Sequence, residues 1–218
     1  MQLLLIDTSG SEGSIALADT DQSASIVTSE TLPGRSASEQ LVPAVRRALA
    51  RSNWKLQGLA AIAVVHGPGS FTGIRVGVSA AKGFSEAAGV PLIAVSRLAL
   101  LAAKGGNGLV HAVLDAGRGE FYYGKYFEGK SLREELLSGE EVRNSTGNEK
   151  IITCEARVAD ALADLNPLIV QEPKAEDMLS IAVHRAKAGN FDDAALLDAN
   201  YLRRTDSELF AKSKSATR

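Results

Sequence analysis

The fold is decided by one stretch, His66-Gly67-Pro68-Gly69-Ser70-Phe71-Thr72-Gly73-Ile74-Arg75-Val76-Gly77, which separates an apolar run from a helix-forming segment. The apolar run, residues 59–65, is typical of a strand that is covered on both faces. The segment at 78–88 predicts a helix, because it is rich in helix formers and precedes Gly89 and Pro91. Residues 92–95 form a second apolar run. A strand, a turn, a helix and a strand in this order predict an α/β protein with a parallel sheet.

The glycine-rich turn does not match either standard phosphate-binding motif. Such a turn before a helix can attract anions, because its backbone N–H groups are free. The dinucleotide fingerprint G-x-G-x-x-G would need a glycine at Thr72, and the P-loop would need a lysine after Gly73. The spacing therefore disfavours phosphate binding here.

A stripe of small residues runs along the helix that follows the turn. Gly73, Gly77 and Ala81 recur at every fourth position, so they lie on one face of the helix. Two interpretations stay open: the stripe packs on the protein's own sheet, or it packs against a helix of another subunit. The second interpretation, extended to the helix expected at 38–52, predicts a partner interface made of Leu41, Val45, Thr72, Gly73, Ile74, Gly77, Val78 and Ala81.

The chain carries two similar openings. A strand at 3–7 ends in Asp7 and is followed by a hairpin, and a strand at 110–114 ends in Asp115 and is followed by a second hairpin. A glycine cluster at 105–108 separates them. We therefore expect two α/β subdomains, 1–104 and 105–218, the second with a polar tail after Arg204.

Other elements follow from local patterns. Residues 36–52 and 174–188 predict helices, and 139–149 predicts a loop with a short strand. Pro43 is expected in the first turn of its helix, where its missing N–H matters least.

Composition limits the function. The chain has 218 residues, a net charge of -2 and no long basic block, so extensive nucleic-acid binding by the chain alone is not indicated. Cys154 is the sole cysteine and is expected to be a small buried hydrophobe. No leader and no apolar run long enough to span a bilayer is apparent, which predicts a cytoplasmic protein without membrane contact.

The residues needed for common catalytic sites are missing. His66, His111 and His184 are the only histidines, and none forms an H-x-x-x-H pair, so no metal site is expected. No base is evident beside Ser70 for nucleophilic catalysis. Asp7 and Asp115 could hold magnesium in a kinase, or each could cap the turn that follows its strand. We expect the turn-capping role, with no catalytic residue and no cofactor.

The central stretch is similar to the GPGSFTGLR signature of the bacterial TsaB family. Three other segments resemble that family in the same order: Leu4-Leu5-Ile6-Asp7-Thr8-Ser9, Asp115-Ala116-Gly117-Arg118-Gly119-Glu120-Phe121-Tyr122 and Asn200-Tyr201-Leu202-Arg203-Arg204. The chain departs from the family pattern at Ala37, Gly117 and Ala199, where relatives often have histidine, arginine and proline.

The resemblance implies a fold and a role. It implies two subdomains of the actin and sugar-kinase-like (ASKHA, ribonuclease-H-like) fold, with mixed sheets flanked by helices. It also implies a noncatalytic subunit that supports threonylcarbamoyl transfer to N6 of adenosine 37 in tRNA. The implied partners are a TsaD-like catalytic paralogue, a TsaE-like ATPase in the larger complex, a second copy when the chain is alone, and tRNA only through the complex. The alternative is a small-molecule kinase or a metallopeptidase-like enzyme of the same superfamily.

Overall fold

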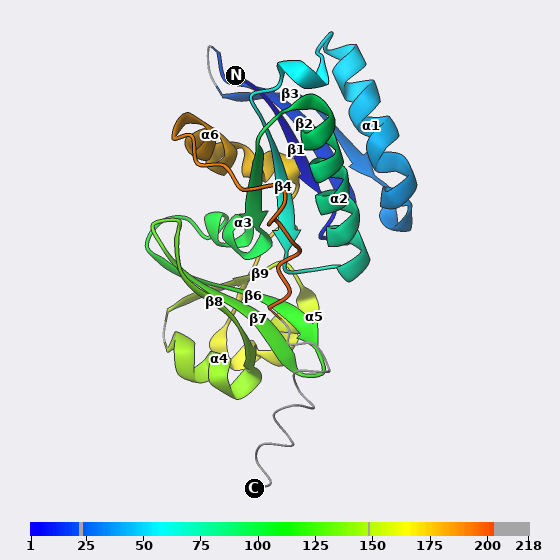
Figure 1. Cartoon of the computed structure of the whole chain (residues 1–218). Helices are drawn as coiled ribbons and strands as arrows, with labels where there is room; N and C mark the ends of the chain where they lie inside the picture. The colour runs from blue at the N-terminus through cyan, green and yellow to red at the C-terminus, as the bar shows by residue number, and fades with distance from the viewer. Residues whose placement is uncertain (22–23, 148, 203–218) are drawn as a thin grey trace, which may run out of the picture.

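The computed structural model describes residues 1–21, 24–147 and 149–202, which form two five-stranded sheets with helices around them (Figure 1). The first sheet has the order β3-β2-β1-β4-β5. Its strands are β1 (Gln2–Asp7), β2 (Gly13–Asp19), β3 (Ser25–Leu32), β4 (Ala61–Gly67) and β5 (Leu92–Ser96). β1, β2 and β3 are antiparallel neighbours, whereas β1, β4 and β5 run parallel, so the sheet is mixed as predicted.

The second sheet repeats this plan. Its order is β10-β9-β6-β7-β8, with β6 (Leu109–Gly117), β7 (Glu120–Phe127), β8 (Lys130–Ser138), β9 (Lys150–Thr153) and β10 (Leu168–Ile169). β6, β7 and β8 are antiparallel neighbours, and β9 pairs parallel with both β6 and β10. Both predicted hairpins, β1–β2 and β6–β7, are present.

Helices cover both faces of the first sheet. α1 (Ala37–Arg51) and α2 (Phe71–Ala88) pack on one face, and η4 (Ala175–Met178) with α6 (Leu179–Lys187) packs on the other (Figure 1). β1 shows why its sequence is continuously apolar. Leu4 and Ile6 belong to the core under α1 and α2, while Leu3 and Leu5 belong to the core under α6. Side chains alternate along a strand, so a strand covered on both sides has no polar face.

The two sheets are joined through α3 (Arg97–Ala103), which follows β5 directly. Its Leu98 and Leu101 are fully buried and pack with Val110 and Ala112 of the second sheet. The chain then returns to the first sheet, because α6 packs there and Asp192 forms a bridge with Leu92. The subdomain boundary at residues 104 and 105 therefore remains a proposal, because α6 and Asp192 follow that boundary in the sequence but contact the first sheet.

Two local expectations are wrong. Most of the segment expected to be a loop at 139–149 is α4 (Gly139–Thr146), whose start has a capping box formed by Ser138 and Glu141. Pro43 lies inside α1 rather than in its first turn. It is exposed, whereas the side chains that α1 buries in the core on the sheet are others: Leu41, Ala44, Val45 and Ala48.

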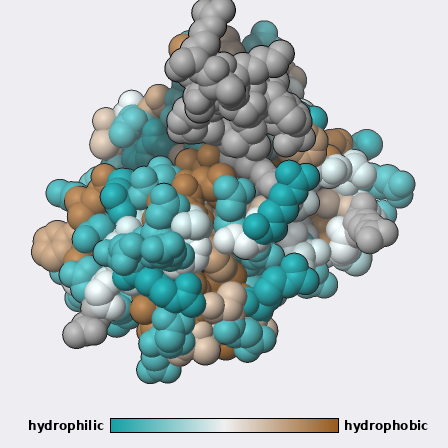
Figure 2. Space-filling model, turned by 90° about the horizontal axis from the view of Figure 1, so that it is seen from below, coloured by the Kyte–Doolittle hydropathy of each residue, from teal (hydrophilic) through white to brown (hydrophobic). Residues whose placement is uncertain are grey.

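The remaining elements are short. α5 (Ala156–Ala161) follows β9, and η1 (Gly34–Ser36), η2 (Leu56–Gly58) and η3 (Ala163–Leu165) are single turns. The end of the molecule that carries the second sheet is largely hydrophilic, with hydrophobic groups interspersed (Figure 2). Among the described residues, no helix is long and apolar enough to cross a membrane. Arg203, Arg204 and the expected polar tail lie outside the described residues.

Candidate functional site

The glycine turn between β4 and α2 is packed against backbone on two sides. A Cβ on Gly69 would lie 2.4 Å from Ser9 O, and one on Gly67 would lie 2.7 Å from Asn200 O. Both glycines have positive φ, which disfavours other residues. Ser70 N donates to Ser9 O at 2.9 Å, and Ser70 Oγ caps α2 by accepting from Gly73 N. The glycines thus allow close approach of three chain segments, and the Ser70 N–H is already bonded.

The predicted small-residue stripe faces the protein's own sheet. A Cβ on Gly73 would lie 1.9 Å from Thr8 O, and one on Gly77 would lie 2.3 Å from Thr8 Oγ1. Thr8 Oγ1 donates to Gly73 O at 2.6 Å, which ties the end of β1 to the first turn of α2. Ala81 is fully buried in the same core.

The other predicted interface residues are also inside this core, with one exception. Leu41, Val45, Ile74 and Val78 are each at most 5% exposed, whereas Thr72 is exposed at the start of α2. The expectation that these small and apolar residues form an exposed surface is therefore corrected. Their spacing marks the face of each helix that packs on the sheet.

A second small-residue stripe lies on the outer face of α2. Ser79, Gly83 and Ala87 are exposed at four-residue spacing, and a Cβ on Gly83 would meet nothing within 4 Å. α1 lies beside α2 (Figure 1), and its Val42 is 51% exposed. Both small-residue stripes of α2 are visible in the sequence, but their four-residue spacing is the same and does not show which of them faces the sheet.

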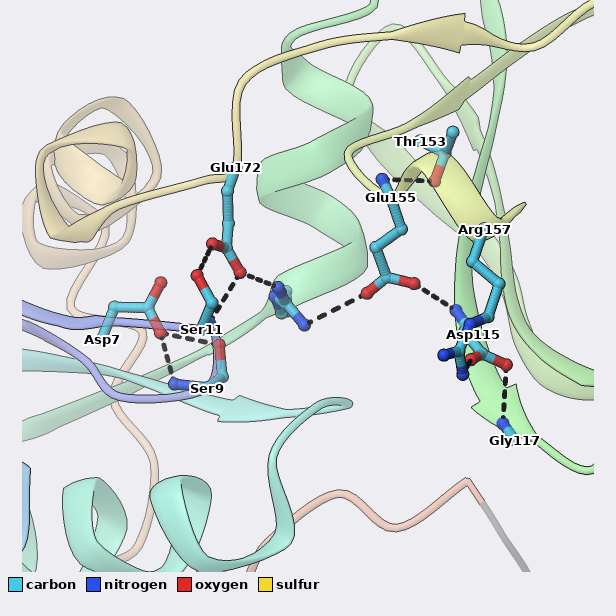
Figure 3. A network of polar contacts seen from close by, with 10 residues as sticks. Asp7, Ser9, Ser11, Asp115, Gly117, Thr153, Glu155, Arg157 and Glu172 are labelled. Carbon is cyan, nitrogen blue, oxygen red and sulfur yellow. Dashed lines mark hydrogen bonds and ion pairs between the residues drawn. The ribbon is translucent and has the colours of Figure 1, made fainter. Parts of the chain in front are cut away.

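A polar network occupies the region between the two sheets (Figure 3). At its centre, buried Arg97 donates from Nη2 to Glu172 Oε1 at 2.6 Å, and its Nη1 lies 4.0 Å from Glu155 Oε1. Glu172 also accepts from Ser11 N at 2.9 Å and from Ser11 Oγ. The guanidinium thus connects the β1–β2 turn, the segment before η4 and the start of α5.

The second aspartate belongs to the same network. Glu155 Oε2 accepts from Asp115 N at 2.7 Å, and the Asp115 carboxylate accepts from Gly117 N at 2.8 Å. Asp115 Oδ2 also pairs with Arg157 Nη1 at 3.2 Å. Burial raises the pKa of Glu155. A cavity of about 490 Å³ adjoins these groups, and its charged lining side chains are one arginine and three carboxylates: Arg97, Asp115, Glu155 and Glu172.

The side chain of Asp7 bonds within the turn that follows β1. Asp7 Oδ1 accepts from Ser9 N at 2.8 Å and from Ser9 Oγ at 2.6 Å. Its side chain is buried, and burial raises its pKa, against the smaller lowering effect of the two Ser9 bonds. Asp7 and Asp115 therefore both cap the turns that follow their strands, in the arrangement that the turn-capping interpretation describes.

The histidines and the cysteine lie apart from this network or at its edge. His111 is fully buried, with Nδ1 2.6 Å from Tyr123 Oη and Nε2 2.6 Å from Glu149 Oε2. Burial lowers the pKa of His111 and of His66. Cys154 is half-buried rather than buried, and burial raises its pKa to about 11. Within the described ranges, no group of three or more His, Cys, Asp or Glu residues could hold a metal ion.

The chain is similar in sequence to known proteins. Residues 26–187 match the family model described as TsaD, tRNA N6-adenosine threonylcarbamoyltransferase. The chain is 31% identical over 225 residues to the tRNA threonylcarbamoyladenosine biosynthesis protein TsaB of Escherichia coli, covering 93% of this chain and 95% of that protein. It is 37% identical to the Bacillus subtilis protein of the same name over 144 residues, which span 65% of this chain and 62% of that protein.

Solved structures show the same fold. The chain superposes with a TM-score of 0.78 and 29% identity on a Pseudomonas aeruginosa protein described as similar to the peptidase YEAZ, covering 93% of this chain and 99% of that one. A Clostridium difficile dehydratase activator with bound ADPNP shares the fold alone, at 10% identity and a TM-score of 0.50. The predicted ASKHA-like fold with two mixed sheets is confirmed.

Proposed function

Because the chain belongs to the TsaB family of tRNA threonylcarbamoyladenosine biosynthesis proteins, we propose that it is the noncatalytic, dimerising subunit for threonylcarbamoyl transfer to N6 of adenosine 37 in tRNA. In this role it pairs with a TsaD-like catalytic paralogue, joins a TsaE-like ATPase in the larger complex and contacts tRNA only through that complex. Alone, it forms a homodimer.

The observation that supports a noncatalytic role is the way in which both strand-end aspartates are used. A magnesium-binding carboxylate needs free oxygen lone pairs directed at the ion. Here the Asp7 side chain is buried and its Oδ1 accepts two hydrogen bonds from Ser9, and Asp115 accepts from Gly117 and pairs with Arg157. Glu172 and Arg97 occupy the space between these turns with an ion pair. The arrangement favours a fixed structural contact between the two halves over a nucleotide site.

The outer faces of α1 and α2 are the surface that we assign to both associations. Ser79, Gly83 and Ala87 leave room for another helix to approach closely, and exposed Val42 of α1 adds apolar area. A two-fold homodimer would bring the same stripe together from each copy. A paralogue with a similar helix pair would offer a similar shape, so the two associations should compete.

Reconstitution of the tRNA modification tests the role. Threonylcarbamoyladenosine formation is measured with the TsaD-like and TsaE-like subunits, a supply of threonylcarbamoyl adenylate, tRNA, and the chain present or omitted. We expect the rate of modification to fall to near background when the chain is omitted. Full activity without the chain would contradict the proposal.

The assigned surface is tested with Gly83→Leu. The substitution fills open space, and leucine favours a helix by roughly 1 kcal/mol over glycine, so the fold should survive. The bulky side chain should prevent close helix approach and weaken both associations about tenfold or more. Ser180→Leu is the matched control, because Ser180 is exposed on α6, across the first sheet. Unchanged association of folded Gly83→Leu would place the interface elsewhere.

A further inference from the structure

A compact aromatic and arginine cluster is exposed where α2 begins. Arg75 Nε donates to Tyr201 Oη at 2.7 Å, and its guanidinium carbon lies 3.8 Å from the centre of the Phe71 ring. The two rings are 5.2 Å apart. Phe71 is 55% exposed and Tyr201 is 36% exposed, so the cluster is held in place but open to solvent. Exposed aromatic and arginine side chains of this kind are enriched in the centres of protein interfaces.

The arginine is oriented but not neutralised. In the described part of the chain, Arg75 forms no ion pair, and its only hydrogen bond uses Nε. Its Nη groups therefore remain available at the surface. The Phe71 contact and the Tyr201 bond fix the plane of the guanidinium before any partner arrives, which lowers the entropy cost of forming a two-pronged contact with a carboxylate.

The two helices α1 and α2 carry an excess of positive charge. α1 and α2 together contain five cationic and two anionic residues: Arg46, Arg47, Arg51, Arg75 and Lys82 against Glu39 and Glu86. Arg47 is neutralised by Glu30 of β3, and Lys82 Nζ donates to Leu197 O. Among the described residues, Arg46, Arg51 and Arg75 have no acidic partner.

We propose that this face fits an acidic protein surface, and that Arg75 receives a carboxylate from the partner. The inference rests on the proposed function and deepens it, because it gives the chemistry of the partner that α1 and α2 meet. A second copy of this chain fits the face less well, since a two-fold axis would place the same excess of cations on both sides. Charge thus selects the paralogue over the homodimer.

A protein partner suits the face better than RNA does. Nucleic-acid binding depends on many clustered phosphate contacts, whereas the three unpaired arginines here are spread over two helices. The same two helices also expose small and apolar groups, Val42, Gly83 and Ala87, which suit close packing of a protein surface.

Charge reversal and salt distinguish these alternatives. The affinity of the purified full chain for the TsaD-like subunit, for itself and for tRNA is measured by sedimentation at low and high salt. The variants are Arg75→Glu, Arg75→Lys and Tyr201→Phe, with Lys187→Glu on α6 as the control. Folding of each variant is checked by its melting curve.

We expect Arg75→Glu to weaken the heterologous complex about tenfold or more, with Arg75→Lys and Tyr201→Phe intermediate. Homodimerisation should be unchanged or stronger in Arg75→Glu. Added salt should weaken the heterologous complex and strengthen the homodimer, because screening removes attraction in one and repulsion in the other. Lys187→Glu should have no effect.

Three results would overturn the inference. The first is a heterologous complex that is insensitive to salt and to Arg75→Glu while Gly83→Leu still disrupts it; that outcome leaves the proposed interface intact and removes only its charge selectivity. The second is loss of homodimer and heterodimer to the same extent in Arg75→Glu. The third is binding of tRNA by the chain alone that Arg75→Glu abolishes without affecting the protein complex.

Discussion

Gly77 and Gly83 both lie inside α2, and replacing each with alanine should change stability in opposite directions. A Cβ on Gly83 would meet nothing within 4 Å, whereas one on Gly77 would lie 2.3 Å from Thr8 Oγ1. Either alanine gains helix propensity worth about 1 kcal/mol. At Gly77 the overlap should cost about 1–3 kcal/mol, and loss of the Thr8–Gly73 hydrogen bond about 1 kcal/mol. We therefore expect Gly77→Ala to destabilise the protein by about 1–3 kcal/mol and Gly83→Ala to stabilise it by about 1 kcal/mol.

Thermal and urea unfolding at concentrations where the chain is monomeric give these free energies. For a chain of this size, each kcal/mol shifts Tm by about 2–4 °C. Thr8→Ala removes the oxygen that the new Cβ would meet, so Gly77→Ala should cost less in that background. Equal stabilisation by alanine at both glycines would show that α2 does not pack on Thr8 as closely as described.

Three further outcomes follow from buried or capping groups. Asp7→Asn should raise Tm at neutral pH. The pKa of Asp7 is raised in the folded protein, so the protein loses stability as pH rises through that folded pKa and the carboxyl group becomes charged. The increase in Tm caused by Asp7→Asn should therefore shrink toward pH 3.8 in a series of Tm measurements. The pKa of His111 is lowered in the folded protein, so the contribution of the neutral imidazole to protein stability is present above the ordinary histidine pKa of 6.5 and is lost as pH falls. The Tm of the wild-type protein should therefore drop more steeply than that of His111→Gln between about pH 7 and about pH 5. Ser138→Ala removes a cap of α4 and should cost about 1 kcal/mol in urea unfolding; no change would mean that the cap is frayed in solution.

The sequence predicted the class, the two hairpins and the mixed sheets because each depends on local signals. A strand ending in Asp7 or Asp115 and followed by glycines is visible in a single segment. Local signals do not predict which face of α2 packs on the sheet. The helix carries two small-residue stripes, one at Gly73 and Gly77 and one at Gly83. Periodicity identifies residues that share a face, but only the packing of Thr8 shows which face is inward.

The network between the halves could not be predicted, because its members come from distant segments. Arg97 and Glu172 are 75 residues apart in the sequence, and no spacing rule pairs them. The failure to predict α4 has a different cause. Ser138 and Glu141 formed a visible capping signal in the sequence, but the polar composition of the segment favoured a loop.

The yield of threonylcarbamoyladenosine from the reconstituted system with Asp7→Asn/Asp115→Asn is the most direct test of a noncatalytic role. Asparagine keeps the oxygen that accepts from Ser9 N and from Gly117 N, so both turns should remain capped. Because neither carboxylate is proposed to hold an ion or a proton in the reaction, the double variant should support modification at the wild-type rate. Loss of modification by the folded double variant, together with magnesium-dependent ATP turnover by the wild-type chain alone, would contradict a noncatalytic role and favour a kinase-like enzyme.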